Sequence, residues 1–352
     1  MKRIRGFDGL RALSALLVFF EHKVQRRGFG LGSVGVWTFF CLSGYLIVQI
    51  LHRSRRAAED GHSSRALIDA LLGFWRNRAL RIFPIYYLVV FSALALGRLG
   101  LAEFAFYATY TQNFYIAFVS HRWGAITHFW TLAIEEQFYL LAAPILIFSP
   151  SSRHGAILAG AFWVCAAYVG ITKLFHVGAV LMPPPSFAFM AAGGYAVIVG
   201  PNAALSRWLS HPVTVVASTG ALGAVCAASW IQNTGDESPA YLNLAGWVFA
   251  ASWVCFVVRY PASGVVACLE TGALTWLGRR SYGFYVYHYL TPSREAAGRL
   301  LRLPTDLLPS GAGWVLLQLA ATLLLSHLSW VYVESRVLAW KRPALSPVAT
   351  PA

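Results

Sequence analysis

Charged residues are scarce in this chain, and acidic residues are the scarcest. Asp, Glu, Lys and Arg together make up 12% of the 352 residues, whereas hydrophobic residues make up 57% and the mean hydropathy is +0.57. A soluble domain carries about twice that share of charge, so the deficit excludes an ordinary soluble protein. Because apolar stretches long enough to span a bilayer recur along the whole chain, we expect one helical membrane bundle with short loops.

Basic residues nevertheless outnumber acidic ones, 28 to 14. This excess is compatible with nucleic-acid binding, but the chain has no DNA- or RNA-binding module and its bases lie between apolar runs, so we expect no nucleic-acid partner. Cysteines are also few. All five lie in or beside apolar segments without metal-ligand spacing, which predicts buried thiols and neither a disulfide nor a metal site.

The apolar runs predict an all-α, polytopic membrane helical bundle of about ten spans. Segment 102–119 is rich in tyrosine and carries Glu103, Gln112 and Asn113, which favours a re-entrant or non-spanning piece that lines a cavity. We expect residues 1–340 to form a single transmembrane domain and 341–352 a short cytoplasmic tail. The expected spans are 7–26, 33–51, 80–97, 129–148, 155–175, 184–200, 211–231, 241–259, 281–298 and 312–335.

The loop charges test this topology, because Lys and Arg collect in cytoplasmic loops. With ten spans and a cytoplasmic N-terminus, most of the basic residues fall inside, which predicts a multi-pass protein of the cell inner (plasma) membrane with both termini cytoplasmic. Lys23, Arg26 and Arg27 are exceptions to this rule, because they lie at the outer end of the first span. They motivate a further hypothesis, that the ligand which binds at this outer end is anionic.

Several ionisable residues fall inside the predicted spans, where each is a functional hypothesis because a charge in lipid is costly. Arg11 and His22 share one helix face about 16 Å apart along the axis. Arg78 and Arg81 share another face at a membrane entrance. The run HFWTLAIEEQFYL places His128 and Glu135 on one stripe, since residues seven apart lie within about 20° of each other.

Six stretches of the sequence, in chain order, resemble the motifs of the acyltransferase 3 family over about residues 6 to 340. They are Arg11 with His22, GVWTFFCLSGY at 35–45, RNRALRIFPIYY at 76–87, HFWTLAIEEQFYL at 128–140, SYGFYVYH at 281–288 and WVYVE at 330–334. The resemblance implies a ten-helix membrane enzyme that transfers an acyl group, commonly acetyl from acetyl-CoA, to a hydroxyl of a carbohydrate or polyketide-like acceptor. It implies no permanently bound cofactor.

The catalytic candidates are His22, His128 and Glu135. His22 is the expected base, because neutral imidazole titrates near working pH, and Glu135 is the group expected to orient it, since Glu21 diverges from His22 by about 100°. Arg11, Arg78 and Arg81 are expected to bind the donor phosphates, for which guanidinium groups are suited. Topology or lipid contact is the alternative role of these arginines.

The substrate-binding candidates are Ser43, Tyr110 and His288. Close helix packing is favoured for the small residues around Ser43, and Ser43 has no adjacent base in sequence that would make it a nucleophile. Tyr110, with its neighbouring tyrosines, is a candidate sugar-stacking surface. Interior hydrogen bonding is the alternative role of His288 and of Glu334.

The chain departs from the family pattern at Trp37, Tyr45 and Ser335, where Asp, Phe and Arg are usual, and the Pro that follows that Arg is absent; the acceptor contacts and the end of the last helix are therefore left open. We expect no SGNH-type domain, because nothing soluble follows residue 340. The alternative function is a proton-coupled transporter or flippase of a glycan or anionic solute, in which the same charges would relay protons. The absence of repeat symmetry counts against it.

Overall fold

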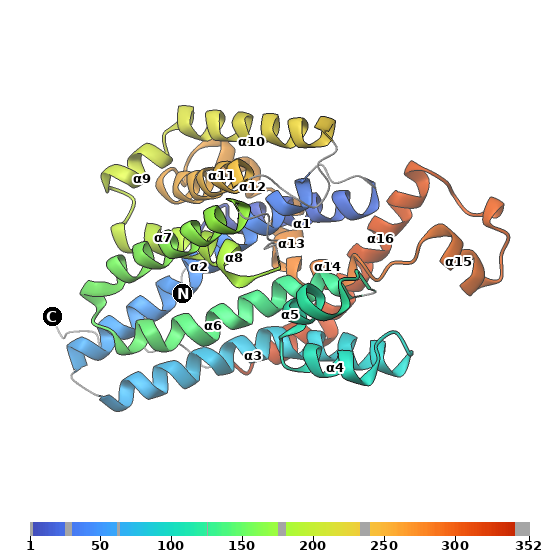
Figure 1. Cartoon of the computed structure of the whole chain (residues 1–352), viewed down its shortest axis with the longest axis horizontal. Coiled ribbons are helices and arrows are strands. Elements are labelled where there is room, and N and C mark those ends of the chain that lie inside the picture. Colours follow the sequence, from blue (N-terminus) through green and yellow to red (C-terminus); the bar gives the residue numbers. More distant parts are fainter. Residues whose placement is uncertain are drawn as a thin grey trace.

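The computed structural model describes residues 3–24, 30–61, 64–124, 126–174, 181–232 and 240–341, and every regular element in these ranges is a helix (Figure 1). A helix satisfies its backbone hydrogen bonds within one segment, which apolar surroundings demand. The prediction of an all-α helical bundle is therefore confirmed.

Eight helices carry most of the bundle. They are α1 (Phe7–Lys23), α2 (Leu31–Gly61), α3 (Ser64–Ala95), α6 (Trp130–Phe148), α7 (His154–Leu174), α8 (Pro183–Val199), α10 (Pro212–Gln232) and α11 (Ala240–Arg259). A ninth long helix, α16 (Ala312–Ser329), continues through the π-helical turn η5 (Trp330–Glu334) into α17 (Ser335–Leu338). The short elements are α4 (Leu101–Ala108), α5 (Gln112–Tyr115), η1 (Ile116–Ser120), η2 (Thr127–Phe129), η3 (Ser151–Arg153), α9 (Ala204–Leu209), α12 (Gly264–Leu269), α13 (Gly272–Arg279), α14 (Ser281–Tyr287), α15 (Arg294–Leu301) and η4 (Thr305–Leu307).

Helix α2 is the central element, packed against α1, α6, α8 and α11. Two of its glycines explain the close approach. A Cβ on Gly44 would lie 2.0 Å from the carbonyl oxygen of Met190 in α8, and a Cβ on Gly35 would lie 2.4 Å from that of Ser14 in α1. Close helix packing, the favoured interpretation of these small residues, is therefore confirmed for both glycines.

Six helices in the described ranges are long and apolar enough to cross a membrane. They are Leu31–Gly61, Arg65–Ala95, Thr127–Phe148, Ser151–Thr172, Leu242–Arg259 and Ala312–Leu338. These six support a multi-pass membrane protein, while the expected number of about ten spans stays a prediction.

The expected span 281–298 is not one helix. Helix α14 ends at Tyr287, and α15 starts again at Arg294 after an irregular turn. Pro292 has no N–H to continue a helix, and the Ser293 hydroxyl accepts a hydrogen bond from the Ala296 N–H at 3.2 Å, so a new helix starts there. This break leaves His288 at the end of α14 rather than in mid-helix.

Segment 102–119 is divided among α4, α5 and η1, as expected for a piece that does not span as one helix. Tyr110, between α4 and α5, has φ 55°, a left-handed conformation that interrupts the helix. The Gln112 amide then donates a hydrogen bond to the Phe129 carbonyl at 2.7 Å, which ties the segment to the start of α6.

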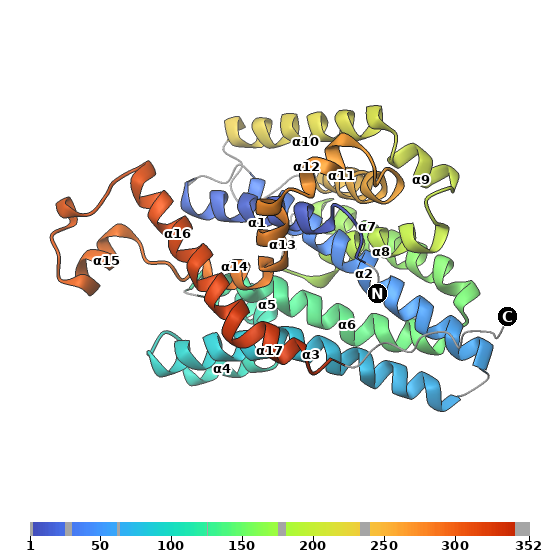
Figure 2. The ribbon, with the colours of Figure 1, turned by 180° about the vertical axis from the view of Figure 1, so that it is seen from behind.

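The C-terminal helix closes one side of the bundle. Figure 2 shows α16 and α17 running across α14 and α3. Arg76 of α3 donates a hydrogen bond to the Trp340 carbonyl at 3.1 Å, which fixes the last described turn against α3. Residues 342–352, the rest of the expected tail, lie outside the described residues.

Candidate functional site

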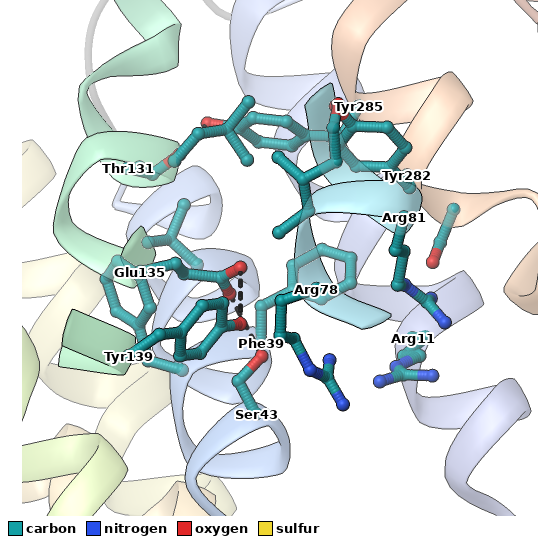
Figure 3. Close-up of a pocket in the computed structure, with 15 residues that line it drawn as sticks. Arg11, Phe39, Ser43, Arg78, Arg81, Thr131, Glu135, Tyr139, Tyr282 and Tyr285 are labelled. Atoms are coloured by element: carbon teal, nitrogen blue, oxygen red, sulfur yellow. Dashed lines mark hydrogen bonds between the residues drawn. The ribbon is translucent and has the colours of Figure 1, made fainter. Parts of the chain in front are cut away.

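A cavity of about 80 Å³ lies between α1, α2, α3, α6 and α14 (Figure 3). Water-sized space of that extent holds several water molecules, so the cavity accommodates the end of an extended ligand rather than a whole nucleotide. The residues around it include Arg11, Phe39, Ser43, Arg78, Arg81, Thr131, Glu135, Tyr139, Tyr282 and Tyr285. The structure thus brings together the three predicted phosphate-binding arginines with two other predicted site residues, Ser43 and Glu135.

The polar side of the cavity is organised by Glu135. Its Oε1 accepts a hydrogen bond from the Ser43 hydroxyl at 2.9 Å, and its Oε2 accepts one from the Tyr139 hydroxyl at 3.1 Å. Three guanidinium groups line the cavity against this one hydrogen-bonded carboxylate. The excess of positive charge suits an anionic ligand, since guanidinium groups pair well with phosphate or carboxylate oxygens.

A further basic side chain, that of Lys341, lies beside the arginines. Lys341 follows α17, and burial together with the charges of Arg81 and Arg78 lowers the pKa of its ammonium group to about 7. Lys341 is not among the residues predicted from the sequence, because it stands at the start of the expected cytoplasmic tail. Only the packing of α17 against α3 reveals its position.

The inner end of the cavity is closed by Tyr285 and Thr131. Their hydroxyl oxygens are 2.7 Å apart, and the Tyr285 hydroxyl lies 2.8 Å from the His128 carbonyl, to which it donates a hydrogen bond. Tyr285 therefore lines the cavity on one side and contacts a histidine segment on the other. Figure 3 shows both side chains at the end of the cavity away from the Arg11 and Arg78 guanidinium groups.

Three histidines gather beyond this wall, from three parts of the chain. His22 is near the end of α1, His128 is in η2, and His288 follows α14. The Nδ1 atom of His22 is 2.9 Å from the Nε2 atom of His288, and the ring centroids of His128 and His288 are 5.2 Å apart. The Tyr289 ring stacks on His128 and meets His22 edge-on.

His288 and His128 are buried and held by backbone carbonyls. The Nδ1 atom of His288 is 2.6 Å from the Tyr285 carbonyl oxygen, and the Nε2 atom of His128 is 3.2 Å from that of Val286. Lys23 lies beside this cluster, where its ammonium group donates a hydrogen bond to the Thr291 carbonyl at 3.0 Å. The cluster therefore combines three imidazoles with one cation.

Two predicted contacts are not found. Glu135 does not orient His22, because its carboxylate is hydrogen-bonded in the arginine-lined cavity while His22 contacts His288. Tyr110 does not offer a sugar-stacking surface. Its ring is packed against Tyr86 and Phe83, with centroids 4.2 and 5.6 Å away, and the residue is only 7% exposed.

Glu21, which diverges from its neighbour His22, has a structural role. Its carboxylate accepts hydrogen bonds from the backbone N–H groups of Gly30, Leu31 and Gly32, at 3.0 to 3.4 Å. These are N–H groups at the start of α2 that no helical carbonyl satisfies. Glu21 thus fixes the end of α1 to the beginning of α2. Two of the three basic residues that depart from the expected charge distribution, Arg26 and Arg27, lie outside the described residues.

Comparison with known proteins places these features in a family. Residues 4–335 match the model of the acyltransferase domain. Relatives include the peptidoglycan O-acetyltransferase OatA of Listeria monocytogenes, 28% identical over 96% of this chain and 56% of its own length. The putative peptidoglycan O-acetyltransferase YrhL of Bacillus subtilis is also 28% identical, over 95% of this chain and 55% of its own.

The O-acetyltransferase OatA of Staphylococcus aureus is 25% identical over 81% of this chain and 50% of its own length. The chain thus spans about half the length of the curated relatives it matches. No solved structure matches it.

Proposed function

Because the chain belongs to the acyltransferase family, we propose that it is a membrane O-acetyltransferase that moves an acetyl group from acetyl-CoA to a hydroxyl of a carbohydrate. The names of its relatives support a glycan acceptor. The single observation that carries the proposal is the arginine-lined cavity whose inner wall, Tyr285 and Thr131, adjoins the cluster of three histidines.

The donor occupies the arginine side. Its phosphates pair with Arg11, Arg78 and Arg81, and Lys341 adds a fourth positive charge when protonated. The cavity is too small for a whole CoA, so the nucleotide stays at the mouth and the narrow pantetheine arm enters. Arg11 and His22 are about 16 Å apart along α1, a distance that an extended arm of that kind can bridge once the side chains of Tyr285 and Thr131, which separate the cavity from the histidine cluster, move aside.

The chemistry takes place at the histidine cluster. His22 removes the proton of the acceptor hydroxyl, and the hydroxyl oxygen attacks the thioester carbonyl carbon. The carbon–sulfur bond then breaks, and the departing thiolate takes up the proton from His22. His128, the other catalytic candidate of the cluster, is buried with its Nε2 atom 3.2 Å from the Val286 carbonyl oxygen, so His22 rather than His128 serves as the base.

The orientation in the membrane follows from the donor. Acetyl-CoA is cytoplasmic, so the arginine side and both termini face the cytoplasm of a cell whose inner (plasma) membrane holds the protein. This agrees with the bias of Lys and Arg toward the loops expected inside. The histidine side then meets a carbohydrate in the outer half of the bilayer, and the donor need not be exported.

The test is acetyl transfer by the purified protein in liposomes, with radiolabelled acetyl-CoA and soluble peptidoglycan fragments as the probe acceptor. We expect His22→Ala to lower the rate of transfer about 10²- to 10⁴-fold, the usual contribution of a general base, without changing the amount of folded protein. His121→Asn, which changes an exposed histidine outside the site, is the control. Undiminished transfer by His22→Ala would remove His22 as the base, and solute transport without thioester cleavage by the wild type would contradict the proposed function.

A further inference from the structure

The turn after α14 presses His288 against His22, and its hydrogen bonds fix where the protons lie. His288 is fully buried, and its Nδ1 is 2.6 Å from the Tyr285 carbonyl oxygen. A carbonyl oxygen only accepts hydrogen bonds, so Nδ1 of His288 carries a proton. A neutral imidazole has one N–H, and Nε2 of His288 therefore presents a lone pair.

That lone pair faces His22. The Nε2 atom of His288 is 2.9 Å from the Nδ1 atom of His22, and the two rings are stacked with their centroids 5.0 Å apart. Because Nε2 of His288 is the acceptor, Nδ1 of His22 is the donor and carries its proton. The lone pair of neutral His22 is then on Nε2, on the far side of its ring from His288.

We propose that His288 is a positioning residue that holds His22 in the tautomer whose Nε2 is basic. The inference rests on the proposed function, in which His22 accepts the proton of the acceptor hydroxyl. As that proton arrives at Nε2, the O–C bond to the acetyl group forms and the C–S bond of the thioester breaks. The Nδ1–H of His22 stays bonded to His288 throughout, and the Nε2 proton passes to the departing thiolate.

Within α1, the Val18 carbonyl also accepts a hydrogen bond from the His22 ring, whereas neither nearby carboxylate does. Glu21 precedes His22 but caps α2, and Glu135 is engaged by Ser43 and Tyr139. Orientation by a second hydrogen-bonding group is what fixes the tautomer of a catalytic histidine. The contact of His22 with His288 joins residues 266 positions apart.

Two isosteric variants separate the two hydrogen bonds of His288. The amide of Gln reaches the position of Nε2, so His288→Gln keeps an oxygen that accepts from His22. The amide of Asn reaches only the position of Nδ1, so His288→Asn keeps the bond to Tyr285 and loses the bond to His22. We expect kcat to fall about 10²-fold or more in His288→Asn and within about tenfold in His288→Gln, with KM for acetyl-CoA changed less than about twofold in both.

The second readout is independent of activity. Histidine ring ¹⁵N NMR of the protein in nanodiscs, with the His22 signals assigned by their loss in His22→Gln, reports which nitrogen bears the proton. We expect an Nδ1–H signal for His22 in the wild type and in His288→Gln, and an Nε2–H signal or a mixture in His288→Asn. His121→Asn is the control that leaves the His22 signals in place.

The outcomes distinguish the two proposals. An Nε2–H signal for His22 in the wild type overturns the positioning role, whatever the variants do. Full kcat in His288→Asn also overturns it, while the proposed function stands. If the wild type transfers no acetyl group, the proposed function fails, and the NMR result still decides whether His288 sets the tautomer of His22.

Discussion

At the scale of single residues, Ser43 gains in the fold the partner that it lacks in sequence. Its hydroxyl donates to Glu135 Oε1, so a carboxylate adjoins a hydroxyl inside the arginine-lined cavity. If Ser43 serves to hold Glu135 in place, Ser43→Ala removes one hydrogen bond to a charged group, worth about 1.5–3 kcal/mol. We expect kcat to fall no more than about 10²-fold, measured by acetyl transfer in liposomes.

The same variant, in a second measurement, tests covalent catalysis. Intact-protein mass spectrometry after mixing with acetyl-CoA and no acceptor should show no acetyl group on the wild-type chain. Ser43→Thr, which keeps the hydroxyl, is the matched control. An acetyl group on Ser43, lost in Ser43→Ala, would instead make Ser43 the nucleophile and move the first chemical step to the arginine side.

If CoA binds in the arginine-lined cavity as proposed, Lys341 should make this binding depend on pH. Its ammonium group, with a pKa of about 7, is charged below that pH and neutral above it. An anionic donor binds better to the protein with a charged Lys341, so raising the pH above 7 should weaken binding. The loss is at most about tenfold per pH unit for one proton, and it ends at the pKa that Lys341 has in the bound state. The measurement is Kd for CoA between pH 6 and 9.

Two substitutions isolate this effect. Lys341→Arg keeps the charge throughout the range, and its Kd should not rise above pH 7. Lys341→Gln should bind CoA more weakly at pH 6 and with a flat profile. A wild-type profile that does not differ from that of Lys341→Gln would remove Lys341 from the donor site.

At the scale of helices, the sequence predicts well whatever lies on one face of one element. Arg78 and Arg81 meet in the cavity because residues three apart share a helix face. The contact between His22 and His288 is different, because two separate segments must pack before it exists. The helix period could not reveal it, and it could not reveal that Glu135 would turn to Ser43 either.

Breaks in the helical backbone are the second kind of feature that the sequence did not predict. An unbroken span over 281–298 was wrong because hydropathy does not register a break. The break itself has local causes, in Pro292 and the capping Ser293. It matters for the site, since it is the turn after α14 that lets the Tyr285 carbonyl hold His288. The aromatic packing of Tyr110 was equally hidden, because burial of a tyrosine depends on its neighbours.

The crossing of α2 and α8 yields a stability prediction. A Cβ on Gly44 would lie 2.0 Å from the Met190 carbonyl oxygen, so Gly44→Ala must push the two helices apart. We expect destabilisation of about 1–3 kcal/mol, measured as a lower melting temperature in detergent. Gly73→Ala in α3, where no atom lies within 4 Å of the added Cβ, is the control and should be neutral or stabilising. Equal shifts in both variants would argue against close packing at Gly44.

At the scale of the whole molecule, the proposed donor and acceptor sites lie at different depths of one bundle. Helix α1 joins them, with Arg11 in the cavity and His22 in the histidine cluster. The proposed reaction therefore requires that the two ends of α1 face different compartments. The side on which the N-terminal end lies is the part of this scheme that a single measurement can decide.

Cys268 is a built-in reporter of that side. It is the exposed member of the five cysteines, and it lies in α12, which is tied to the start of the chain. Arg3 forms an ion pair with Glu270 at 2.9 Å, and the Gly6 N–H donates a hydrogen bond to the same carboxylate at 2.6 Å. Cys268 and the N-terminus therefore share one side of the membrane.

We expect a membrane-impermeant maleimide to label Cys268 in inverted membrane vesicles and to leave it unlabelled in intact spheroplasts. The other four cysteines are buried, so Cys268→Ser should abolish the labelling and serves as the control. Labelling from the outside of spheroplasts would put the arginine-lined cavity on the outer side. Acetyl-CoA could not then reach it from the cytoplasm, and the donor, rather than the acceptor, would have to be reassigned.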